Sequence, residues 1–94
     1  MSNAKPARSR SLTVRGSRWK VRWVNTLADN YGVCDYGKRE IRIAKGQPTA
    51  VELDTVVHEL LHAALPDLDE PAIAETAEAL ATALVKLGFV KDRP

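Results

Sequence analysis

The chain has 94 residues, of which 45% are hydrophobic and only five are aromatic, and its net charge is +2. This is enough for one small domain with a mostly aliphatic core, and too little for a deep, enclosed cleft. The single cysteine, Cys34, excludes an internal disulfide, and no apolar run reaches the roughly 20 residues of a membrane span.

The small net charge conceals an uneven distribution. Residues 1–46 carry 11 basic and 3 acidic side chains, a net +8, whereas residues 47–94 carry 3 and 9, a net −6. A basic half can bind an acidic partner or nucleic acid, although such charge is more often solvated surface. No apolar run follows the basic N-terminus, so we expect no secretory signal and a cytoplasmic protein.

The N-terminal residues 1–10 show no apolar period, and we expect them to be disordered, ahead of a single domain over 11–90. A short first strand is expected over 12–14. The segment 19–23 then alternates apolar and basic residues, which predicts a half-buried strand. Its core-facing residues would be Trp19, Val21 and Trp23.

An alternation of aromatic and basic residues can also form a stacking strip for nucleic acid. For segment 19–23 we favour the buried strand, because this chain has few other large side chains with which to fill a core.

Two further strands are expected over 31–36 and 39–43. Because a tight turn separates them, the simplest arrangement is an antiparallel hairpin, with Asp35 capping the turn. In the second of these strands Ile41 and Ile43 would face the core.

The second half of the chain predicts two helices. The first runs over about 50–65 and ends at Pro66, with Thr49 and Glu52 forming a capping box at its start. The second helix begins after Asp69, an expected N-cap, and ends near Leu87. We expect its core stripe to comprise Ile73, Ala77, Leu80, Ala81, Leu84 and Leu87.

The short connection between the helices makes them antiparallel neighbours. The expected fold class is therefore α+β, a small antiparallel sheet followed by an antiparallel two-helix hairpin.

The first helix contains the pattern H-E-x-x-H at His58, Glu59 and His62, the only two histidines of the chain. Residues four apart lie on one face of a helix, so both imidazoles can bind one metal ion, with Glu59 placed to handle a proton. The alternative is two ordinary histidines on a buried helix. The metal site is favoured because an apolar stripe elsewhere on the helix supplies the core, formed by Leu53, Val56, Val57, Leu60, Leu61 and Ala64.

A catalytic zinc usually has three protein ligands, and the chain offers no third histidine. The candidates are carboxylates of the second helix, Glu70, Glu75 and Glu78. We favour Glu70, which projects within the apolar stripe and starts the helix close to His62. The alternative role for Glu70 is to complement the helix dipole. Asp54, one turn before His58, is expected to orient a histidine.

The segment 55–63, T-V-V-H-E-L-L-H-A, preceded by a strand such as 39–43, resembles the zincin metallopeptidases. It is most similar to small gluzincin-like domains of bacteria and phages, akin to SprT-like and ImmA/IrrE-like proteins. The resemblance covers roughly residues 19–87 and implies a minimal zincin-like metalloprotease fold. It also implies a sheet whose edge strand, here 39–43, binds an extended peptide.

The expected function is therefore zinc-dependent hydrolysis of a peptide or protein substrate, with His58, His62 and Glu70 holding Zn²⁺ and Glu59 as general base. Tyr31 or Tyr36 could stabilise the oxyanion, although both are more readily structural. The alternative is a catalytically silent zincin-like domain that binds a partner, or nucleic acid, through the basic N-terminal half. No role is assigned to the thiol of Cys34, and no membrane partner is expected.

Overall fold

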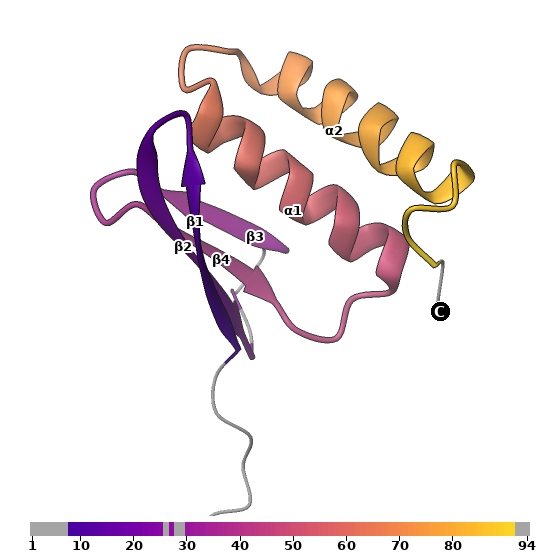
Figure 1. Cartoon of the computed structure of the whole chain (residues 1–94), viewed down its shortest axis with the longest axis horizontal. Helices are drawn as coiled ribbons and strands as arrows, with labels where there is room; N and C mark the ends of the chain where they lie inside the picture. Colours follow the sequence, from indigo (N-terminus) through magenta and orange to yellow (C-terminus); the bar gives the residue numbers. More distant parts are fainter. Residues whose placement is uncertain (1–7, 26, 28–29, 92–94) are drawn as a thin grey trace, which may run out of the picture.

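A computed structural model describes residues 8–25, 27 and 30–91. It has the expected α+β class, with four strands followed by two helices (Figure 1). The strands are β1 (Ser9–Val14), β2 (Ser17–Val24), β3 (Gly32–Asp35) and β4 (Glu40–Ala44), and the helices are α1 (Thr49–Ala64) and α2 (Glu70–Lys86).

The strands form one sheet in the order β1-β2-β4-β3. The pairs β1–β2 and β3–β4 are antiparallel, and the second pair is the predicted hairpin. The expectation of a wholly antiparallel sheet is wrong for the central pair, because β2 and β4 run parallel. The expectation that segment 39–43 forms the sheet edge is also wrong, since β4 lies between β2 and β3. The edge on that side is β3.

The predicted disorder over residues 1–10 lies mostly outside the described residues, which begin at residue 8. It is wrong at Ser9 and Arg10. Both belong to β1, where they pair with Arg22 and Val21 of β2. Strand pairing at a sheet edge therefore orders a segment that has no apolar period of its own.

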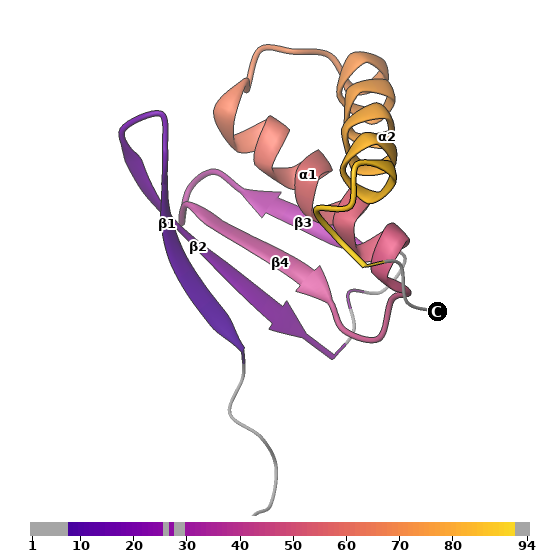
Figure 2. The same cartoon turned by 45° about the vertical axis from the view of Figure 1, so that its right-hand side comes forward.

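The main core lies between the sheet and α1. Its buried members are the residues predicted to face inward, and Val56, Leu60 and Ala63 of α1 pack against them. Both helices lie on the same side of the sheet (Figure 2). The buried strand residues are Trp19, Val21, Trp23, Ile41 and Ile43.

Helix α2 packs against α1, and in the described part of the chain its backbone does not come close to any strand. Its buried face is therefore narrow and consists of Ile73, Ala77 and Ala81. The predicted core stripe is wrong at Leu80 and Leu87, whose exposed fractions are 44% and 70%.

The two helix starts differ in how they are capped. Asp69 caps α2 as predicted, and its Oδ1 accepts a hydrogen bond of 2.9 Å from the backbone N–H of Ala72. The predicted capping box of α1 is wrong, because Pro48 is the N-cap and no side chain caps that end. The carboxylate of Glu52 instead accepts a hydrogen bond of 2.8 Å from the indole N–H of Trp23. Helix α1 is thus fastened to the sheet.

No helix in the described ranges is both long and apolar enough to span a membrane.

Candidate metal centre

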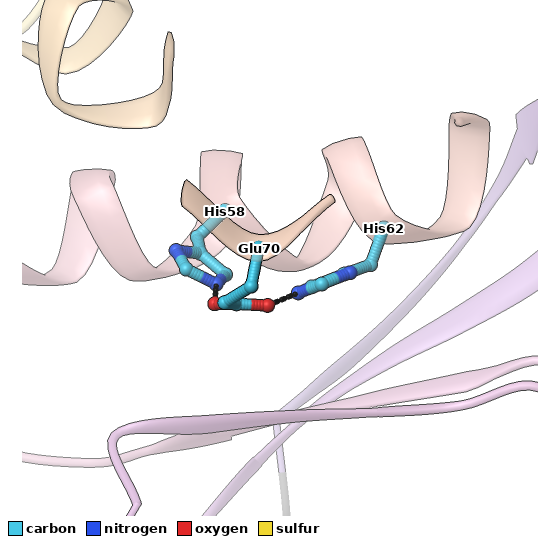
Figure 3. A group of neighbouring side chains, drawn as sticks. All are labelled: His58, His62 and Glu70. Carbon is cyan, nitrogen blue, oxygen red and sulfur yellow. Dashed lines mark ion pairs between the residues drawn. The ribbon is translucent and has the colours of Figure 1, made fainter. Parts of the chain in front are cut away.

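The side chains of His58, His62 and Glu70 converge at one point (Figure 3). One carboxylate oxygen of Glu70 lies 2.7 Å from Nε2 of His58, and the other lies 2.9 Å from Nε2 of His62. The two imidazole rings, one helical turn apart on α1, have centroids 5.0 Å apart. One ligand atom from each residue lies within 4.8 Å of the other two, so the three residues can share one ion.

Capping of α2 explains why Glu70 reaches the histidines. The turn after α1 is closed by a hydrogen bond of 3.0 Å from the N–H of Leu68 to the carbonyl of Leu65. Asp69 then caps α2, and the proline at the start of α2 favours the helical backbone. Glu70 is therefore the first helical residue, and its side chain extends over the C-terminal half of α1 (Figure 3).

The other two candidate ligands lie elsewhere. Glu75 lines a shallow hollow on the outer surface of α2, together with Glu78 and Lys86. Glu78 also lines a hollow of about 400 Å³ between α1 and α2. Among the described residues, neither belongs to the group that can hold a metal with the histidines.

Glu59 lies beside this group with its side chain largely buried, at 8% exposure. Burial raises the pKa of its carboxyl group, the two neighbouring histidines partly offset this rise, and Glu70 adds to it. The Glu59 carboxylate forms no hydrogen bond or ion pair with any other described residue. Its oxygens are not fully buried, so they keep some exposure to solvent. A buried carboxylate without a structural partner is more typical of a chemical role than of a stabilising one.

A glycine in β3 lets the strand approach Glu59. A Cβ atom added to Gly32 would lie 3.0 Å from Cγ of Glu59 and 2.7 Å from Cγ2 of Thr55. Only glycine allows this edge strand to lie directly on the motif helix. A glycine inside a strand pattern often marks such a close approach, and this signal was available in the sequence.

Gln47 also fixes the start of β3, and nothing in the sequence marked it. Its amide nitrogen donates to the carbonyls of Tyr31 at 3.2 Å and Ala44 at 2.8 Å. Its amide oxygen lies 2.9 Å from the hydroxyl of Thr55, which is also 2.9 Å from the carbonyl of Val51. One side chain thereby links the ends of two strands to α1.

Two open hollows of about 410 and 350 Å³ flank the triad of His58, His62 and Glu70. They join into a groove between β3 and α1, because both are lined by the same residues at their junction. These shared residues are Asn30, Gly32, His58, Glu59 and Glu70. The carboxylate of Glu59 and the triad therefore face one space that a substrate can enter.

The remaining predicted residues occupy the two ends of this groove. Tyr36 is held structurally, because its hydroxyl donates to the carbonyl of His62 at 3.0 Å and its ring packs edge-on against Trp19. Tyr31 is 66% exposed and lines the larger hollow. Asp54 lines that hollow too, but in the described structure it forms no hydrogen bond with either histidine. Its predicted role in orienting a histidine is therefore not supported.

A scan of protein-family models, a search of curated proteins and a search of solved structures each found no match to this chain. The function is therefore inferred from the geometry of the site.

Proposed function

We propose that this protein is a zinc-dependent metallopeptidase that hydrolyses an extended peptide in the groove between β3 and α1. The observation that supports this most strongly is the arrangement of Glu59, a largely buried residue whose carboxylate has no partner among the described residues. It faces the same groove as the converging donors of His58, His62 and Glu70. The proposal includes the cytoplasmic location expected from the sequence.

The three donor residues fit a zinc ion. Two imidazole nitrogens and one carboxylate are a known protein ligand set for catalytic zinc, which keeps a fourth position for water. Ligand atoms about 2.1 Å from a tetrahedral ion are roughly 3.4 Å apart. The Nε2–Oε separations of 2.7 and 2.9 Å require only a small outward shift of Glu70. With 62% of its side chain exposed, Glu70 is free to make that shift.

Bound zinc would supply Lewis acidity, polarising the scissile carbonyl and lowering the pKa of water. Glu59 then accepts a proton from the attacking water and returns it to the leaving nitrogen of the substrate. The close approach of Gly32 keeps the Glu59 side chain in one position and excludes water from one side of it. His58 and His62 are held by α1, so the proton acceptor and the metal donors stay in fixed register.

The position of β3 supports an extended substrate. Among the described residues it is the last strand of the sheet, so one side of its backbone has no partner strand there. An extended peptide can add to such an edge through main-chain hydrogen bonds. β3 contributes Gly32, Val33 and Cys34 to the lining of the groove, next to the triad. We therefore propose β3, in place of segment 39–43, as the peptide-binding edge strand that the resemblance implies.

Two other functions fit the structure less well, an iron-dependent oxygenase and a catalytically silent domain that binds nucleic acid. Two histidines and one carboxylate also bind ferrous iron in oxygenases, but hydrolysis explains the unpartnered Glu59 better. A silent domain would bind nucleic acid through the basic half. On the outer face of the sheet, however, Arg22 and Arg42 contact Glu40 at 3.2 and 3.6 Å, and both tryptophans face inward. As far as the structure describes it, that face therefore has no aromatic surface on which bases could stack.

The decisive experiment compares peptide hydrolysis by zinc-loaded wild type, Glu59→Gln and the control Glu75→Gln, which makes the same chemical change on the outer surface of α2. Glu59→Gln should retain zinc but lose at least about 100-fold in rate, because it cannot accept a proton. Glu75→Gln should keep the wild-type rate. A Glu59→Gln variant as active as wild type would remove Glu59 from this role. Salt-sensitive DNA binding without peptide cleavage would favour the silent domain.

A further inference from the structure

We infer that Asp54 selects substrates that carry a Lys or Arg side chain next to the scissile bond. This inference names the substrate class of the proposed peptidase and rests on the proposed function. Asp54 lies one helical turn before His58 on α1, and it lines the same hollow of about 410 Å³ as His58, Glu59 and Glu70.

The carboxylate of Asp54 has no structural role among the described residues. Asp54 is half-buried, and it forms no hydrogen bond or ion pair with any of them. In the described structure no hydrogen bond joins it to His58, whose Nε2 lies 2.7 Å from a carboxylate oxygen of Glu70. A half-buried carboxylate loses part of its hydration and regains little unless a cationic or hydrogen-bonding group binds to it.

The charge of the hollow matches a cationic guest. Its lining contains three carboxylates and no Lys or Arg. Two of these carboxylates are committed in the proposed site, one as a metal ligand and the other as a proton acceptor. The charge of Asp54 therefore remains available to the substrate.

The shape of the hollow also suits a long basic side chain. Tyr31 and Val51, 66% and 39% exposed, line it together with Asp54. The methylene groups of a Lys or Arg can pack against this apolar surface while the charged end reaches the carboxylate. An acidic side chain in the same place would be repelled. The smaller hollow on the other side of the triad contains Cys34 and Tyr36 and offers no carboxylate beyond those of the centre, so the selectivity should act on one side only.

The test measures binding rather than turnover. Zinc-loaded Glu59→Gln protein is titrated with short end-blocked peptides in which one Arg is moved along an otherwise uncharged sequence, beside the same set with Gln. At one position Arg should bind about tenfold more tightly than Gln, the gain expected for a charge-assisted hydrogen bond. Adding Asp54→Asn should reduce this preference to about twofold or less.

Asp67→Asn, which makes the same chemical change on the exposed turn between the helices, should leave the preference for Arg intact. Zinc content and thermal melting of each variant check that it is folded. The inference is overturned if no peptide position favours Arg, if Asp54→Asn keeps the preference, or if Asp67→Asn loses it equally. The proposed function fails by a separate result, the absence of hydrolysis of every peptide by zinc-loaded wild type.

Discussion

Gly32 of the edge strand lies against Glu59 of the motif helix, so that a Cβ atom on the glycine would be 3.0 Å from Cγ and 3.2 Å from Oε2 of the glutamate. The same Cβ would overlap Cγ2 of Thr55 at 2.7 Å. Gly32→Ala therefore forces β3 away from α1 or displaces Glu59. We expect a loss of about 1–3 kcal/mol in the free energy of unfolding, measured with denaturant, and a lower rate of peptide hydrolysis.

Gly37 in the β3–β4 turn provides the control for this substitution. A Cβ added there meets only Oδ1 of Asp35, at an ordinary contact distance of 3.5 Å. Gly37→Ala should change the stability by no more than about 0.5 kcal/mol. Equal effects of the two substitutions would show that the close approach of β3 to Glu59 is not important.

The third ligand can be tested by two matched substitutions on α2. Glu70→Gln should weaken zinc binding by more than about 100-fold, because Glu70 is proposed to bind the metal directly. Loss of a residue that only hydrogen-bonds to a ligand already costs about 10–100-fold in affinity. Glu75→Gln should leave the affinity unchanged. Affinities are measured by competition with a chelating dye. Weak zinc binding by Glu75→Gln together with normal binding by Glu70→Gln would show that the third ligand is Glu75 and not Glu70.

Glu52 holds α1 to the sheet rather than capping its own helix. Glu52→Ala leaves the indole N–H of Trp23 without its partner at 2.8 Å, and Trp23 is only 9% exposed. We expect the free energy of unfolding to fall by about 1–3 kcal/mol. Thr49→Ala should change it by less than about 0.5 kcal/mol, because no side chain caps this helix. A larger loss of stability for Thr49→Ala would instead support the predicted capping box.

The thiol of Cys34 should react slowly in the folded protein. Burial raises its pKa from 9.0 to about 11, and the charge of Glu59 adds to the rise. At pH 8 the folded chain then has about 100-fold less thiolate than an unperturbed cysteine, so alkylation by iodoacetamide should be correspondingly slower.

The same shift in pKa has a consequence for stability. As pH rises above 9, the thiol ionises first in the unfolded chain, so the fold loses stability between about pH 9 and 11.

The control for the alkylation experiment is the chain unfolded in guanidinium chloride, which gives the reaction rate of the unperturbed thiol. Equal rates for folded and unfolded protein at pH 8 would contradict the burial of this thiol.

Local patterns were sufficient to predict most of the helical half of the site. The spacing of His58 and His62 placed both imidazoles on one helix face, and the N-cap at Asp69 placed Glu70 at the start of α2. Projection along the helix then favoured Glu70 over Glu75 and Glu78. The structure brings together the triad that this reasoning selected, while the binding of zinc stays a prediction.

The order of the strands could not be predicted in the same way. The inward-facing residues of β2 and β4 follow from alternation, but their parallel pairing depends on contacts between distant segments. The hairpin β3–β4 inserts β4 beside β2, which leaves β3 at the edge. The extent of burial on α2 was missed for a related reason, since helical period cannot show that, within the described residues, α2 packs on α1 and not on the sheet.

The proposed function requires that His58, His62 and Glu70 hold one zinc ion. Metal content, measured by plasma emission on protein purified without added metal, tests it most directly, with wild type beside His62→Ala. We expect about one zinc per chain in wild type and its loss in the variant, because the two remaining ligands hold zinc poorly. Wild type without zinc, even after zinc is offered, or equal zinc in both proteins, would contradict it.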